Sequence, residues 1–332
     1  MGGALAVYLH ARAGEFLRAL RLHGETGADT AATTAAVRSL RMAARRISGT
    51  LHTFRPLLDP LWADRLSTEL AWLSTTLAQE HACTSRLSRL LDALGRLSGA
   101  STVPQARTGP ALTGTGPALT GAGAAAQRGA LTVGAARAGA LLDRQLTLAR
   151  TRAHSASLQA LGSARFHAVA DAVAVLASEL PLAPATGPHP PAAEVTERRL
   201  LTAVAALPLA RAGHPYNAEA LVNGLATASA EEAQDAPWHQ VRRLLRLRRY
   251  ALEVLVPDAD PLLARAGLLL DRHRDAAEAA AAAATAAGTP RIAPATAYAL
   301  GVLHADQRHE VEAARFAFQE IWQRSIAVRA GR

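Results

Sequence analysis

Leucines recur along residues 61–97 at the spacing of an α-helix that buries one face. They lie three or four positions apart, the interval between side chains on one helix face. Hydrophobic residues make up 50% of the chain but aromatic residues only 4%, and Ala and Leu dominate. Ala and Leu are strong helix formers, whereas strands favour β-branched and aromatic residues. We therefore predict an all-α fold.

Two stretches rich in small residues and proline divide this helical chain. In the first, the hexapeptide Gly-Pro-Ala-Leu-Thr-Gly occurs at 109–114 and again at 116–121, which is typical of a low-complexity linker. The predicted parts are a first helical bundle at 1–98, the linker at 99–134, and the remaining helices at 135–332 with a Pro-rich loop at 181–193.

Turn residues break the first bundle at 24–29 and 55–60, which gives three or four helices there. The total is about ten helices. After the linker we expect them at 135–161, 165–180, 194–206, 218–230, 238–256, 261–287 and 296–325.

The positive charge of the chain comes from arginine, with the histidines counted as neutral. It has 36 basic and 27 acidic residues, a net charge of +9, and no lysine. The guanidinium group stays protonated and its planar fork of donors suits phosphate oxygens. Without lysine, a Schiff base or a catalytic ammonium is excluded.

The cysteine content and the hydropathy of the chain exclude several classes of protein. The single cysteine, Cys83, excludes an internal disulfide and a zinc site of two or more thiolates. No signal peptide is visible, and no stretch reaches the roughly 18 uncharged apolar residues of a membrane span. We expect a cytoplasmic protein without membrane segments.

Arginines form a stripe on a helix in the first bundle. Arg38, Arg41 and Arg45 fall at i, i+3 and i+7, so they share a narrow sector, and His52 continues the stripe. Residues 30–58 contain no acid, so local ion pairs do not explain these arginines.

A second helix repeats this geometry. His239, Arg242, Arg246 and Arg249 fall at i, i+3, i+7 and i+10, and residues 236–252 contain no acid. Such a face is often only solvated surface. Stacked like charges repel, however, at a cost of a few tenths of a kcal/mol per spacing, and a bound polyanion would reverse that sign.

Both helices resemble the signature of the CHAD family, the conserved histidine α-helical domain. Its pattern is an apolar residue, His, two variable residues, Arg, three variable residues and a basic pair. The second copy resembles residues 238–253, and the first resembles residues 37–58 with Arg38 in place of the histidine. The family's Arg-Asp-x-Asp segment corresponds to residues 81–84, which lack its acids. Weaker similarity continues at 161–166, 271–275 and 314–322.

The resemblance implies two helical bundles related by a pseudo-twofold axis around a basic central cavity that binds polyphosphate. A weak internal repeat between the two arginine helices agrees with it. The polyphosphate-binding residues that it implies are Arg38, Arg41, Arg45, Arg46, Arg55, Arg165, His239, Arg242, Arg246, Arg249 and Arg272.

Other sites are poorly supported. His304 and His309 are five positions apart and lack further ligands at metal spacing. Glu310 and Glu312 lie near Arg308 and Arg315, which predicts a solvated, ion-paired face. No phosphate-binding glycine loop, dinucleotide fingerprint or nucleophile elbow occurs. We expect no catalysis, cofactor or metal.

The sequence thus predicts non-catalytic binding of inorganic polyphosphate, and association with polyphosphate granules would follow. Two alternatives stay open. One is a general polyanion or nucleic-acid binder, although few aromatic residues are present to stack bases. The other is a scaffold that docks an acidic protein. The oligomeric state is not defined.

Overall fold

The computed structural model describes residues 2–25, 30–99, 121–184, 192–213, 228–256 and 260–330. Within these residues the secondary structure is helical apart from one isolated antiparallel bridge between Leu58 and Leu182. The predicted all-α class is confirmed.

The first bundle begins with α1 (Gly2–Glu25) and α2 (Thr30–Thr53), followed by the short 3-10 helix η1 (Arg55–Leu57). The stretch of recurring leucines forms α3 (Pro60–Thr76) and α4 (Gln79–Leu97). The Asp59 carboxylate caps α3, because it accepts a hydrogen bond from the Trp62 backbone N–H at 2.8 Å, and Pro60 occupies the first helical position, where no donor is needed.

The long helix α5 (Gly121–Leu161) begins earlier than the predicted end of the linker at residue 134. Alanine, the best helix former, is frequent in residues 122–130 and outweighs the glycines there. Residues 100–120 lie outside the described part of the chain. Next follow α6 (Ala164–Leu176), α7 (Ala192–Ala205) and α8 (Leu209–Ala212). Most of the helix predicted at 218–230 also lies outside the described residues.

Three long helices complete the chain: α10 (Ala228–Leu255), α11 (Pro261–Ala287) and α12 (Pro294–Ala330). Helix α10 starts ten residues before the predicted Trp238 and continues through Pro237. Proline in a helix interior lowers the stability of the helix by about 3 kcal/mol, so tertiary contacts of the turns before Pro237 must offset this loss. Asp235, one helical turn before Trp238, makes such contacts.

The buried residues form three main clusters. The first joins α1, α2, α3 and α6 with the last turns of α10. The second joins α4, α5, α11 and α12, and the third joins α7, α10, α11 and α12. Helix α10 therefore takes part in two cores, and it packs against α2 of the first bundle.

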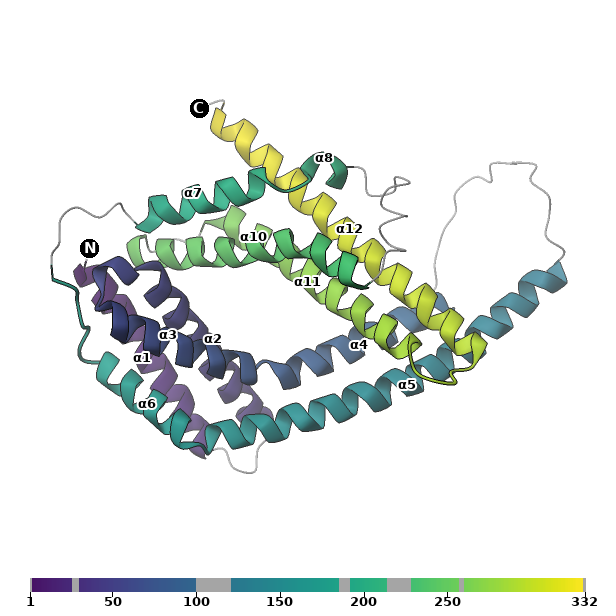
Figure 1. The fold of residues 1–332 in the computed structure, drawn as a ribbon, viewed down its shortest axis with the longest axis horizontal. Helices are drawn as coiled ribbons and strands as arrows, with labels where there is room; N and C mark the ends of the chain where they lie inside the picture. The colour runs from purple at the N-terminus through teal and green to yellow at the C-terminus, as the bar shows by residue number, and fades with distance from the viewer. Residues whose placement is uncertain are drawn as a thin grey trace.

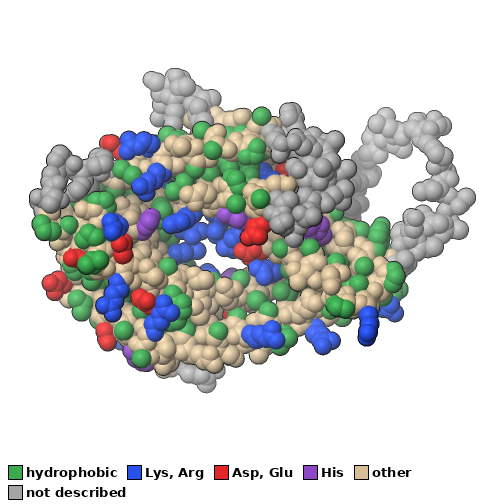
Figure 2. All heavy atoms as spheres, in the orientation of Figure 1, with side chains coloured by type: hydrophobic (Ala, Val, Ile, Leu, Met, Phe, Trp, Pro, Cys, Tyr) green, Lys and Arg blue, Asp and Glu red, His purple; other side chains and the backbone are tan. Residues whose placement is uncertain are grey.

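The helices enclose an open middle. In Figure 1, α10 and α11 run above it, α2 and α3 lie to one side, and α4 and α5 run below. Figure 2 shows that side chains do not fill this space: the face is hollowed at its centre, and arginine side chains gather around the rim. The pseudo-twofold relation between two halves stays a prediction.

Candidate functional site

A pocket between α2 and α10 collects arginines from both predicted stripes. Arg45 and Arg46 come from α2, while Arg242, Arg246 and Arg249 come from α10. These five side chains are partly buried. The remaining lining residues are Met42, Leu245, Tyr250, Gly267 and Asp271.

A glycine allows the two arginine helices to approach this closely. Gly49 of α2 faces the ring of Tyr250 on α10, and a Cβ built on Gly49 would stand 2.6 Å from Tyr250 Cδ2. Any larger residue at this position would push the helices apart. Because Gly49 lies one helical turn after Arg45 and Arg46, this contact sets the distance between the two arginine stripes.

One carboxylate, Glu253, lies beside the pocket. It pairs with Arg46 of α2 at 3.4 Å and with Arg249 of its own helix at 3.6 Å. It also accepts a 2.8 Å hydrogen bond from the Tyr8 hydroxyl of α1. Burial, followed by the charge of Glu253, raises the pKa of Tyr8 well above its usual value. Three helices therefore meet at a single acidic side chain.

The middle of the pocket has more positive than negative charge. Asp271 of α11 accepts a hydrogen bond from Arg242 Nε at 2.5 Å. Arg45 and Arg246 form no ion pair with any described residue. Burial, together with the charges of Arg242 and Arg45, lowers the pKa of Arg246 to about 10. The buried Arg45 Nε has no hydrogen-bond partner in the described part of the chain.

Beyond this pocket, further basic side chains of α2, α4 and α11 influence one another, although Arg274 of α11 also pairs with Asp275 and Glu278. Burial lowers the pKa of Arg41, and the charges of Arg45, Arg274 and Arg38 lower it further. Burial also lowers the pKa of His81 on α4, and the charges of Arg41 and Arg38 are the next largest causes. Arg274 was not among the predicted residues, although it lies in a segment that resembles the family.

Besides Arg38 and Arg41, four predicted residues lie outside the pocket lining, and two of these four are fully engaged elsewhere. Arg55 donates to both oxygens of Asp64, each at 2.7 Å. Arg165 donates to both oxygens of Glu69 at 2.6 and 3.2 Å, and its guanidinium stacks 3.9 Å from the Trp72 ring centre. Ion pairs between residues far apart in the sequence leave no local pattern, so sequence reasoning could not find these partners.

The other two are Arg272 and His239. Arg272 is exposed, and no described residue contacts it in an ion pair or hydrogen bond. His239 is half-buried, and its ring meets that of His273 edge-on at 5.4 Å. Burial lowers the pKa of His239, while Asp235 acts in the opposite direction. His239 thus lies between the arginine stripe and a buried polar network.

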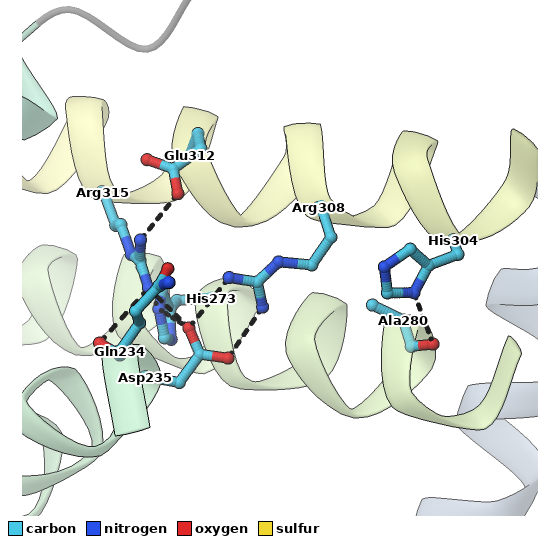
Figure 3. A network of polar contacts seen from close by, with 8 residues as sticks. All are labelled: Gln234, Asp235, His273, Ala280, His304, Arg308, Glu312 and Arg315. Atoms are coloured by element: carbon cyan, nitrogen blue, oxygen red, sulfur yellow. Dashed lines mark hydrogen bonds and ion pairs between the residues drawn. The ribbon is translucent and has the colours of Figure 1, made fainter. Parts of the chain in front are cut away.

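That network corrects the predicted solvated face on α12. Arg308 and Arg315 are only 5% and 6% exposed, and both donate to Asp235 of α10, at 2.8 and 2.5 Å (Figure 3). Glu312 accepts from Arg315 at 2.6 Å. The charges balance within the protein, which is the condition for burying them. The arginines face inward because α12 packs closely on α11.

His273 of α11 completes the network. Its Nε2 accepts a 3.2 Å hydrogen bond from Arg315 Nε and lies 3.5 Å from Asp235. Burial, which outweighs the opposing influence of Asp235, lowers the pKa of His273 to about 4. His273 is therefore neutral at pH 7. Burial alone would raise the pKa of Asp235, but its contacts with His273 and Arg308 hold that pKa well below its usual range.

The described residues contain neither a cluster of metal-ligating side chains nor a membrane-spanning helix. No group of three or more His, Cys, Asp or Glu side chains among them is placed to hold a metal ion. No helix in the same part of the chain combines the length and apolarity of a membrane span. The pocket lining contains five guanidinium groups, which can hold an anion by paired hydrogen bonds.

The fold and the site define a class of helical proteins in which two arginine-rich helices converge on one pocket. Comparison with known proteins is consistent with this class. Residues 11–287 match the CHAD domain, so the chain belongs to the CHAD domain family. Among solved structures it is similar to PptA from Streptomyces chartreusis, with 57% sequence identity and a TM-score of 0.78. The match covers 97% of this chain and 99% of that one. A comparison with curated proteins finds no match.

Proposed function

We propose that this protein binds inorganic polyphosphate without catalysis, in the pocket between α2 and α10. One observation carries the proposal: Arg45, Arg242 and Arg246 come from two helices far apart in the sequence and line one pocket. Of these three arginines, only Arg242 has an acidic partner among the described residues. Partly buried like charges that lack counter-ions are costly, and a polyanion would remove that cost. Polyphosphate binding, which the resemblance to the family implies, fits this arrangement.

The binding mechanism follows from charge. A polyphosphate chain carries condensed counter-ions, and arginines that contact its phosphates release them, so affinity falls as salt concentration rises. Paired guanidinium hydrogen bonds then set the path of the chain. Association with polyphosphate granules in the cytoplasm would be a consequence of this binding.

Two features favour binding over catalysis and polyphosphate over nucleic acid. Among the described residues, Asp271 is the only carboxylate lining the pocket, and it is already paired with Arg242. These lining residues therefore offer no acidic pair to hold the Mg²⁺ that phosphoryl transfer uses. The only aromatic lining residue, Tyr250, is 4% exposed and packs on Gly49. It therefore offers no free ring face on which a base could stack.

Titration calorimetry tests the proposal. Long-chain polyphosphate would be titrated into the wild type and into Arg242→Ala/Arg246→Ala at two salt concentrations, with single-stranded DNA and RNA as competitors. The matched control is Arg150→Ala/Arg152→Ala, which removes the same charge from two exposed positions of α5. We expect salt-dependent binding that the pocket variant loses and the control keeps.

The other outcomes are equally informative. Displacement of polyphosphate by nucleic acid at equal concentration would indicate a general polyanion binder. Binding of an acidic protein but not of polyphosphate would indicate a scaffold. If neither variant differs from the wild type, the pocket arginines are not the binding site and the proposal fails.

A further inference from the structure

A second group of basic side chains lies on the outer surface beside the pocket. Arg243 of α10 and Arg199 of α7 are both exposed, and neither forms an ion pair with a described residue. His52, in the last turn of α2, is also exposed. None of the three residues lines the pocket between α2 and α10.

Two contacts bring these three helices together. Arg248 of α10 donates to the Ala193 carbonyl at 2.5 Å and to Glu197 at 3.0 Å, which holds α7 along α10. The contact of Gly49 with Tyr250 holds the last turns of α2 on α10. Helices α7 and α2 therefore both pack on α10, and Arg199, Arg243 and His52 are exposed side chains of these three neighbouring helices.

The charges of Arg243 and Arg199 act on His52. Partial desolvation lowers the pKa of His52, and the charges of Arg243 and Arg199 are the next largest causes. The acid that opposes them is Asp64, which is already bound by both nitrogens of Arg55. Arg199 and Arg243 themselves have no ion-pair partner among the described residues. In Figure 2, arginine side chains extend from the rim of the central hollow towards α7.

We infer that His52, Arg199 and Arg243 form an outer phosphate-binding surface, over which a long polyphosphate chain continues after it leaves the pocket. Arg242 and Arg243 are neighbours on α10, so the pocket and the outer surface meet there without a gap in the chain of basic residues. This inference rests on the proposed function. It predicts that the number of phosphates bound, and hence the affinity, depends on the length of the ligand.

The test compares tripolyphosphate, which is short enough to stay in the pocket, with long-chain polyphosphate. Calorimetry at several salt concentrations would be run on the wild type, on Arg199→Ala/Arg243→Ala, and on the equally charged control Arg150→Ala/Arg152→Ala. All substituted side chains are exposed, and thermal melts would verify that each variant folds. For the outer variant we expect unchanged affinity for tripolyphosphate. For the long chain we expect a salt slope lower by about two, one for each lost phosphate contact.

The outcomes separate this inference from the proposed function. If the wild type binds neither ligand, the proposed function fails. If it binds both, and the outer variant binds the long chain with the same affinity and salt slope, polyphosphate binding stands and the outer surface is refuted. An equal loss in the α5 control would also refute the outer surface, because it would show an effect of net charge alone.

Discussion

Gly49 of α2 lies directly against the ring of Tyr250 on α10, so closely that a Cβ at residue 49 would overlap two ring carbons at 2.6 and 2.7 Å. Tyr250 is buried and cannot turn away easily. The separation of the two arginine stripes thus depends on the absence of a side chain at a position that contributes no charge.

We expect Gly49→Val to weaken both folding and polyphosphate binding. Overpacking of this kind costs about 1–3 kcal/mol of folding free energy, and movement of α2 would separate Arg45 from Arg246. Urea denaturation and calorimetry measure the two effects. Gly301→Ala is the control, because a Cβ at residue 301 would meet no neighbouring atom within 4 Å. Wild-type affinity in Gly49→Val would contradict the assigned role of this contact.

Replacing Glu253 by Gln should strengthen polyphosphate binding, whereas Gly49→Val should weaken it. The amide keeps an acceptor for the Tyr8 hydroxyl but removes the charge that neutralises Arg46 and Arg249. Polyphosphate should then bind more tightly at low salt, with a steeper salt dependence. The pKa of Tyr8 should fall towards its usual value, which ultraviolet titration detects. Unchanged affinity would mean that Arg46 and Arg249 do not contact the ligand.

Asp235→Asn should be strongly destabilising. It would leave the buried guanidinium groups of Arg308 and Arg315 without their shared counter-ion, and breaking a buried pair in this way costs about 3–5 kcal/mol. Chemical denaturation measures the loss. Asp64→Asn breaks an exposed pair with Arg55 and should change stability little. If the two variants had similar free energies of unfolding, the buried network around Asp235 would not stabilise the fold more than an exposed ion pair does.

Stability should fall as the pH drops from 6.5 to about 4. The pKa of His273 is about 4 in the folded protein against an ordinary value of 6.5, so the unfolded chain binds more protons between these values. The depressed pKa of Asp235 adds a loss at lower pH, below the ordinary pKa of an aspartate. Thermal melts across pH should show this trend in the wild type. His273→Gln should flatten the curve between pH 6.5 and 4, and an unchanged curve would assign the trend to other groups.

Arg55→Ala and Arg165→Ala should leave polyphosphate affinity intact. Both guanidinium groups are held at two nitrogens by carboxylates, and Arg165 also stacks on Trp72. A ligand phosphate would have to displace these partners. Calorimetry on each variant, beside Arg246→Ala, measures the difference. A large loss in either variant would extend the binding site towards η1 or α6.

The arginine stripes were predictable because helical periodicity is a local property. The positions of Arg45, Arg242 and Arg246 on their helix faces follow from the sequence, and the structure brings these residues together. The close approach of α2 and α10 at Gly49 could not be predicted from the sequence, because a glycine within a helix does not by itself indicate a helix contact. The partners of Arg55 and Arg165 lie on other elements, and no local pattern marks them.

The buried network was also beyond local reasoning. Arg308 and Asp235 are 73 positions apart, and a charged residue on a helix is usually solvated. A signal was nevertheless present: Arg308 and Arg315 share a helix face with Val311 and Phe318, both fully buried. Arginines that share a helix face with buried apolar residues indicate a buried counter-ion elsewhere in the chain.

The attachment of Asp235 to α12 bears on where this domain ends. The family match stops at residue 287, before α12 begins at Pro294. A fragment cut at that boundary would keep the arginines of α10. It would leave Asp235 of the same helix without Arg308 and Arg315, which neutralise its charge in the whole domain. The packed domain therefore includes α12 at least as far as Arg315, beyond the residue at which the family match ends.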